Sequence, residues 1–346
     1  MKNFIFIFCI LIILFKTETV LSNNNIFDVN NIEISEENSK NNEELLNQAF
    51  KTAFNELIKR LLLEEDYRNL ANTKLEKIKK LISYYQIINS DKDIIKNYTK
   101  FNISFNKDRM HNFFYNQNIL YSDILNTDVI LFPLLKKNNE YFIYTKNYFY
   151  ENWNIENSKN LIEYTLPVEN IENIQKIKKK KNNIFAIDIS DFFKEYNIKN
   201  MVFAIIDIES SGSKIYLSTK INKKKINKNL FIERAGLNQI QFFNKIIIEI
   251  KNKIKDIIKS QNLIDVRTPS FLNVQIKFNN KSDLVEFNNR INQIDLIDNY
   301  YVQQISKDYA LVKIKYLGKI NKIINKLNDL DINLKMLNGQ WEINII

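Results

Sequence analysis

The chain contains a single cysteine, and its position limits how the protein can be held together. Cys9 lies inside an apolar run at residues 4–15, between a short positively charged start and a polar stretch. This order is typical of a secretory signal peptide, and we expect cleavage near Ser22. The mature chain, from Asn23 onward, then has no disulfide and no thiolate metal site. Its fold has to be held by its hydrophobic core alone.

The apolar run near the amino terminus also argues against a membrane anchor. The apolar run has about twelve residues, whereas a membrane-spanning helix needs about twenty. A lipoprotein would need a cysteine at the cleavage point, where Asn23 stands instead. We therefore expect a soluble protein, residues 1–22 being removed, that works outside the cytoplasm.

Two further scarcities exclude several kinds of chemistry. His111 is the only histidine, so the chain cannot form a multi-histidine zinc site, and a serine triad would have to be built on this residue. The four glycines, at positions 212, 236, 318 and 339, are isolated from one another, which excludes a glycine-rich phosphate loop of the P-loop or dinucleotide-binding type. We expect no cofactor, no metal and no nucleotide chemistry.

The basic balance of the chain does not specify a partner. A net charge of +10 accompanies abundant Lys, Asn and Ile and scarce Gly and Pro, a bias that an AT-rich genome would impose on any protein. We expect no nucleic acid partner, while anionic lipid or a cell-wall polymer would suit the charge. With 346 residues, the chain can bury a substantial core in two or three domains.

The apolar periodicity predicts a multi-domain α/β protein, beginning with an α/β unit at residues 23–125. Asn41 precedes Glu44 by the spacing of a capping box, and an apolar face at helical spacing follows. Strands are expected at 81–88 and 98–105, and a second helix at 107–118.

A middle α/β unit is predicted at residues 126–265. Strands are expected at 128–135, 140–145, 201–209 and 214–221. A long helix at 237–259 closes the unit, with Lys245, Lys251, Lys255 and Lys259 away from most of its apolar stripe. We expect this helix to belong to the core, and the alternative is a basic amphipathic helix on a membrane surface.

The last unit, residues 266–346, has the clearest pattern. Alternation predicts strands at 272–278, 296–305 and 309–316, with helices after Ser282 and Gly318. Segments 333–337 and 341–345 are interpreted as one last strand, bent at Gly339. The order βαββαβ predicts a ferredoxin-like sandwich of two helices on a four-stranded sheet, which we expect to fold by itself. Its other sheet face, mixed basic and apolar, would then be available for docking.

Several hydrophobic motifs carry a resemblance to known families. They are AFKTAF at 49–54 with LIKRLL at 57–62, FNISF at 101–105 and VILFPL at 129–134. These motifs resemble an uncharacterised proteobacterial family of exported proteins known only as a domain of unknown function. The first unit is also similar to the amino-terminal domain of flagellar assembly protein T, and the middle unit is loosely similar to that of the Tol translocation protein B. The resemblance implies a periplasmic protein with an accessory role and brings no catalytic residues.

Two groups of side chains are candidates for binding. One is a basic run that would suit a polyanion, although charge runs between periodic elements are usually solvated: Lys178, Lys179, Lys180 and Lys181. The other is an aromatic cluster that would suit a platform for carbohydrate or peptide, although two adjacent strands and a helix start favour burial of half of it in the core: Tyr144, Tyr148 and Trp153.

Asp207 and Glu209 are the only acids that suggest catalysis. They are two residues apart on an expected strand, so they face the same side, as a carboxylate pair for glycan hydrolysis would. Asp188 and Asp191 are interpreted as helix-capping residues around Ser190. A structural role is expected for His111, because no nucleophile motif surrounds it.

These observations favour a non-catalytic binding or assembly module of the cell envelope, located in the periplasm or, alternatively, secreted. We expect its partner to be an envelope protein or a cell-wall polymer, and any membrane contact to be peripheral. The rival interpretations are a metal-independent envelope hydrolase that uses Asp207 and Glu209, and a membrane-surface protein that uses the helix at 237–259.

Overall fold

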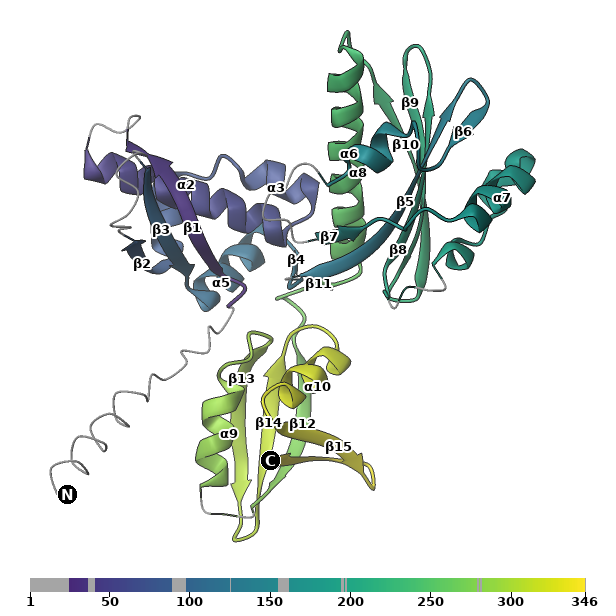
Figure 1. The fold of residues 1–346 in the computed structure, drawn as a ribbon. Coiled ribbons are helices and arrows are strands. Elements are labelled where there is room, and N and C mark those ends of the chain that lie inside the picture. The colour runs from purple at the N-terminus through teal and green to yellow at the C-terminus, as the bar shows by residue number, and fades with distance from the viewer. Residues whose placement is uncertain are drawn as a thin grey trace, which may run out of the picture. The chain divides into compact units, whose positions relative to one another are not determined.

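The protein has an α/β fold with several separate sheets (Figure 1). The computed structural model describes residues 25–36, 41–88, 98–124, 126–154, 162–193, 196, 198–278, 280 and 282–345, so the expected signal peptide lies outside the described residues. The chain divides into two compact units. Unit 1 consists of Met1–Glu33, Leu81–Met110 and Thr268–Ile346, and unit 2 of Ile34–Lys80 and His111–Arg267. Each unit therefore joins stretches that are distant in sequence, and the boundaries expected near residues 125 and 265 stay predictions.

Unit 1 contains most of a three-stranded sheet with the order β1-β3-β2, formed by β1 (Asp28–Ser35), β2 (Ile82–Ile88) and β3 (Tyr98–Phe105). The two predicted strands, β2 and β3, are confirmed. The sequence pattern missed β1 because Asn31 has a φ of 59°, in the left-handed region that Asn tolerates. Val29 and Ile32 are consequently both buried although they are three residues apart, which hides the alternation.

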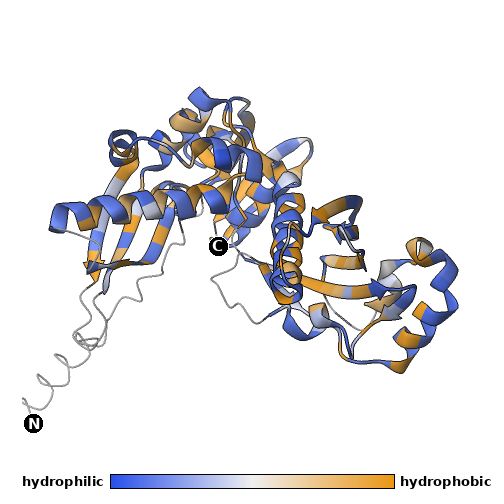
Figure 2. Ribbon diagram, turned by 90° about the horizontal axis from the view of Figure 1, so that it is seen from above, coloured by the Kyte–Doolittle hydropathy of each residue, from blue (hydrophilic) through white to orange (hydrophobic). Residues whose placement is uncertain are grey.

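The carboxyl-terminal part of unit 1 is a five-stranded sheet with two helices. In chain order its elements are β12 (Ser270–Lys277), α9 (Asp283–Ile291), β13 (Ile297–Ile305), β14 (Tyr309–Tyr316), α10 (Ile320–Asn328), β15 (Ile332–Leu337) and β16 (Gln340–Ile345). The strand order is β13-β14-β12-β16-β15. Hydrophilic and hydrophobic residues alternate along some of the strands (Figure 2). On β14 the buried set is Ala310, Val312, Ile314 and Tyr316.

The predicted bent last strand is wrong, since the chain makes a hairpin there instead. Asn338 and Gly339 both have positive φ, which suits a two-residue hairpin turn between β15 and β16. In a ferredoxin-like sheet the strand after the second helix lies beside the first strand. Here β16 takes that place, parallel to β12, and β15 lies outside it at the edge.

A half-buried polar pair lies between the two sheets of unit 1. Lys107, at the start of α5 (Lys107–Gln117), donates from its ammonium group to the Ile297 carbonyl at 2.6 Å. Asp295 accepts a hydrogen bond from the backbone of Ile26. Burial lowers the pKa of Lys107 and raises the pKa of Asp295, and the attraction between the two charges opposes both shifts.

Unit 2 is built around a six-stranded sheet. Its strands β5 (Thr127–Lys137), β6 (Glu140–Phe142), β8 (Met201–Ile208), β9 (Gly212–Ile221) and β10 (Lys224–Glu233) follow the order β10-β9-β8-β5-β6, and β7 (Ile162–Thr165) pairs with β5. All except β7 and β10 were predicted. The sequence pattern missed β10 because its lysines dominate the segment, and Lys223 lies in the turn that precedes it.

Helices cover both faces of this sheet (Figure 1). On one face, α8 (Gln239–Ser260) and α6 (Tyr148–Asn152) pack on residues such as Leu131 and Val202. On the other, α7 (Ile171–Lys179) packs near Phe132 and Phe203. Burial on both faces explains the near-continuous apolar runs of β5 and β8. The expectation that α8 is a core helix is confirmed.

The remaining helices of unit 2 include α2 (Asn42–Leu61) and α3 (Glu64–Leu70), which are followed by α4 (Leu75–Leu81). Asn41 caps α2 as predicted, with its side chain accepting from the Glu44 amide at 2.8 Å. A short bend at Leu62 and Leu63 separates α2 from α3.

Lys259 of α8 ties this bend to the rest of unit 2. Its ammonium group is buried, with 3% of the residue exposed, and donates to the carbonyls of Lys59, at 2.7 Å, and of Leu62. One turn earlier, Asp256 accepts from the Glu64 amide at 3.2 Å. The sequence pattern placed Lys259 on the polar side of its helix, but it is a buried link between two elements.

We expect Lys259 to make stability depend on pH. Burial lowers its pKa from 10.5 to about 8, so between these values the unfolded chain binds more protons and rising pH stabilises the fold. Relative to Lys259→Met, the free energy of unfolding of the wild type should rise by about 3 kcal/mol across this window. Urea unfolding at pH 7.5, 9 and 10 measures the difference.

The control is Lys51→Met, because Lys51 is exposed on α2. Its difference from the wild type should stay constant across the same pH series. If the difference in unfolding free energy between the wild type and Lys259→Met were also constant with pH, the lowered pKa of Lys259 would be contradicted.

Candidate functional site

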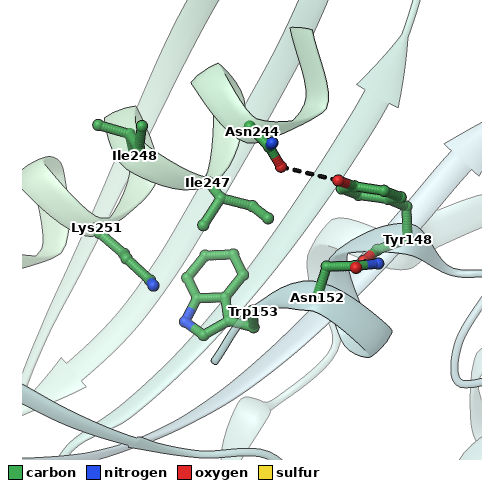
Figure 3. A pocket seen from close by; sticks show the side chains of 7 residues that line it. All are labelled: Tyr148, Asn152, Trp153, Asn244, Ile247, Ile248 and Lys251. Carbon is green, nitrogen blue, oxygen red and sulfur yellow. Dashed lines mark hydrogen bonds between the residues drawn. The ribbon is translucent and has the colours of Figure 1, made fainter. Parts of the chain in front are cut away.

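A small pocket lies between α6 and α8 (Figure 3). Its volume is about 110 Å³, and its lining residues are Tyr148, Asn152, Trp153, Asn244, Ile247, Ile248 and Lys251. Tyr148 donates from its hydroxyl to the Asn244 side-chain oxygen at 2.8 Å, which fixes one wall of the pocket. The pocket belongs entirely to unit 2.

Trp153 forms the opposite wall and is completely buried. The Lys251 ammonium lies 5.8 Å from the Trp153 ring centroid and 5.9 Å from that of Tyr164, within the range of cation–π attraction. Burial raises the pKa of the Tyr164 hydroxyl. Among the described residues, neither the Trp153 indole nitrogen nor the Tyr164 hydroxyl has a hydrogen-bond partner.

The lining of this pocket does not resemble an active site. It contains no carboxylate, histidine or hydroxyl nucleophile paired with a base, and Lys251 is its only charged residue. Sites for drug-sized ligands have volumes of roughly 300–1,000 Å³. The pocket therefore admits only a small molecule or a few waters.

The predicted aromatic platform is wrong as a single surface. Tyr144 is buried on the α7 side of the sheet, where its hydroxyl accepts from Asn173 at 3.1 Å. Trp153 is buried on the α8 side, and Tyr148 is half-buried there. Tyr144 follows β6, whereas Tyr148 and Trp153 belong to α6 and its end, and these two segments pack on opposite faces of the sheet. A cluster that is compact in sequence is therefore divided between two cores.

The acidic pair lies at the end of β8, where each carboxylate is held by a lysine. Lys136 contacts Asp207 at 2.5 Å, and Lys214 contacts Glu209 at 2.6 Å. The hydrogen bond to Asp207 raises the pKa of Lys136. Two carboxylates that each contact a separate lysine are typical of surface ion pairs. The role of Asp207 and Glu209 in hydrolysis stays a prediction.

His111 is a buried residue of α5 in unit 2. Its Nε2 lies 3.1 Å from the Tyr121 hydroxyl, and the two rings stack with centroids 5.5 Å apart. This environment agrees with the structural role predicted for it. Asp188 accepts from the Ser190 amide at 3.0 Å, as expected of a cap, while the side chain of Asp191 lies outside the described residues.

The four lysines of the basic run are exposed where α7 ends and a 3-10 helix (Lys181–Ala186) begins. Lys178 and Lys179 belong to the last turn of α7, where positive charge interacts favourably with the helix dipole. The favourable interaction with the helix dipole explains the positions of Lys178 and Lys179 without a ligand. Binding of a polyanion by the run stays a prediction.

The lysines of α8 do not give a membrane-binding helix. The apolar side of α8 is buried in the core of unit 2, through residues such as Phe242, Ile250 and Ile257. Membrane-surface helices need that side for the lipid. In the described part of the chain, no helix is long and apolar enough to cross a membrane, and no group of three or more acidic, histidine or cysteine side chains could hold a metal.

The open face of the carboxyl-terminal sheet has the surface character expected for docking. On this side of β14, Lys313 lies opposite Asn273 of β12 and Tyr301 of β13. Its ammonium group is 4.5 Å from the ring centroid of Phe271, which is 52% exposed, and Tyr301 is 48% exposed. We call Phe271, Tyr301 and Lys313 the open-face cluster.

Helix α9 packs on the other face of this sheet. Phe287 of α9 contacts the Tyr300 ring edge to face, at 5.7 Å between centroids, and the Tyr300 hydroxyl is bonded to Asn288. Tyr300 and Tyr301 are adjacent in β13, so their side chains point to opposite faces. The open-face cluster therefore lies away from α9.

Comparisons with protein-family models, curated proteins and solved structures find no match for this chain. The family resemblance stays an expectation, and the function has to be argued from the residues themselves.

We expect no single acid or histidine to be essential. Asp207→Asn, Glu209→Gln and His111→Gln should each restore function to a strain that lacks the gene. The two acid variants should lose less than about 1 kcal/mol of unfolding free energy, because their ion pairs are partly exposed. By contrast, Trp153→Ala should cost about 3–5 kcal/mol. A variant that stays folded but fails to complement would show that the protein has catalytic chemistry.

Proposed function

We propose that the protein is an exported, non-catalytic binding module of the cell envelope, which docks an envelope protein on the open-face cluster. The observation that carries this proposal is the pairing of Lys313 with exposed Phe271 on a sheet face that α9 leaves uncovered. Protein interfaces are enriched in exposed aromatic residues of this kind, which anchor the contact energetically.

The charges around the cluster favour an acidic partner surface. Lys315 is bound to Asp298 at 2.6 Å, and Lys277 to Glu342 at 2.5 Å. Lys313 contacts the Phe271 ring, and in the described part of the chain it forms no ion pair. A partner carboxylate would therefore meet an uncompensated positive charge at the centre of the face.

The proposed location depends on the start of the sequence, where a charged residue, an apolar run and a cleavage site follow one another. Intact-mass analysis of the envelope fraction should find a chain that lacks residues 1–22. A full-length cytoplasmic product would contradict export.

Docking can be tested by site-specific photo-crosslinking in the native envelope, with the photoreactive residue at position 301. We expect one major crosslinked protein, with an acidic surface. Lys313→Glu should abolish this crosslink, because like charges then face each other. Phe271→Ala should weaken binding of the purified partner roughly tenfold to thirtyfold.

The matched control is Val285, which is 61% exposed on α9. Val285→Ala should leave binding unchanged, and a photoreactive residue at 285 should not give the same product. Folded Lys313→Glu and Phe271→Ala variants that complement a deletion strain fully would contradict docking at this face.

A further inference from the structure

We propose that the pocket between α6 and α8 binds a small organic acid, whose carboxylate lies between Trp153 and Lys251. Three features of the pocket support this ligand: a buried donor without a partner, an adjacent ammonium group and preformed walls. The pocket belongs to unit 2 and the open-face cluster to unit 1, so this inference does not rest on the proposed function.

The donor is the indole nitrogen of Trp153. This nitrogen is buried and, in the described part of the chain, has no hydrogen-bond partner. Native proteins leave few buried donors in this state, and a bound water or ion is one explanation for such a group. Figure 3 shows the nitrogen on the edge of the ring that faces the Lys251 side chain, which also lines the pocket. The donor is therefore aimed into the pocket.

Lys251 supplies the positive charge beside this donor. Its ammonium group lies 5.8 Å from the Trp153 ring centroid and 5.9 Å from that of Tyr164, and these two rings meet edge to face. An ammonium group and an indole N–H can only donate, so neither satisfies the other, and an acceptor between them serves both. Because an ammonium group has three N–H donors, this role is compatible with further contacts of Lys251. A carboxylate combines acceptor oxygens with the complementary charge.

The walls of the pocket are fixed by hydrogen bonds. Tyr148 donates from its hydroxyl to the Asn244 side-chain oxygen at 2.8 Å, and its carbonyl accepts from the Asn152 side-chain amide at 2.9 Å. Ile247 and Ile248 add apolar surface. Preformed walls that combine apolar side chains with a few polar groups are typical of small-molecule sites. The two isoleucines favour an organic acid over an inorganic anion.

The volume of the pocket limits the ligand to a few atoms. At about 110 Å³ the pocket has the room of roughly four waters, counted at ~30 Å³ each. This room suits a carboxylate with about four to six non-hydrogen atoms, such as acetate, propionate or lactate. Asn244 and Ile248 are exposed, so a ligand can enter from solvent beside them.

A titration with propionate, followed by NMR of the ¹⁵N-labelled indole groups, tests the site, because the chain has only two tryptophans. Trp341→Phe assigns the two signals. We expect the Trp153 N–H signal to move downfield to saturation, with a Kd of roughly 0.1–1 mM. The Trp341 signal, from β16 of unit 1, should not move. Propionamide, which lacks the charge, should give no saturable shift up to about 50 mM.

Lys251→Met removes the charge and should weaken propionate binding by roughly tenfold or more. The matched control is Lys253→Met, which removes a lysine of the same helix that does not line the pocket. This variant should bind propionate as the wild type does. A wild-type Trp153 signal that propionate does not shift to saturation would overturn the proposal. So would equal binding of propionamide, or equal affinity of Lys251→Met and the wild type for propionate.

Discussion

One buried lysine of α8 links the end of α2 to the rest of unit 2. Lys259 supplies its ammonium group to the carbonyls of Lys59 and Leu62, at the end of α2 where the helix leaves its last carbonyls without partners. Asp256, one turn earlier on α8, accepts from the first amide of α3. A single stretch of α8 thus satisfies both the negative end of one helix and the positive end of the next.

Unit 1 uses the same kind of link. Lys107 donates to the Ile297 carbonyl, and Asp295 accepts from the backbone of Ile26, so a polar pair joins stretches from the beginning and the end of the chain. Because the sequence has a single cysteine, it can form no internal disulfide, and such links act together with the apolar cores. Their removal would leave buried charges and backbone groups unpaired, which is costly.

The sequence predicted the elements whose burial alternates regularly and missed those in which one residue breaks the pattern. Strand β14 and helix α8 were readable because their apolar residues repeat at the period of the structure. The left-handed backbone at Asn31 breaks the alternation of β1, so the pattern did not predict this strand. The lysines of β10 gave that segment the composition of a solvent-exposed loop. The chain reverses direction at Asn338 and Gly339, where one bent strand was predicted. The alternation within each segment does not show which strand it pairs with, so the hairpin could not be distinguished from a bend.

Side-chain roles were harder to predict than elements. Asp207 and Glu209 were correctly placed near one strand end, but their lysine partners come from β5 and from the start of β9. Lys259 gave no signal, because its partners are backbone carbonyls 197 and 200 residues away. The face of the last sheet that the helices leave open could be predicted from the alternation along β14.

We expect unit 2 to unfold as one cooperative body although it is discontinuous in sequence. Native-state amide hydrogen exchange tests it most directly, by comparing the opening free energies of α3 and the last turn of α2 with that of α8. These amides should exchange through the same opening, with equal free energy and equal dependence on denaturant. Exchange of α2 and α3 through a separate opening of much lower free energy would contradict it.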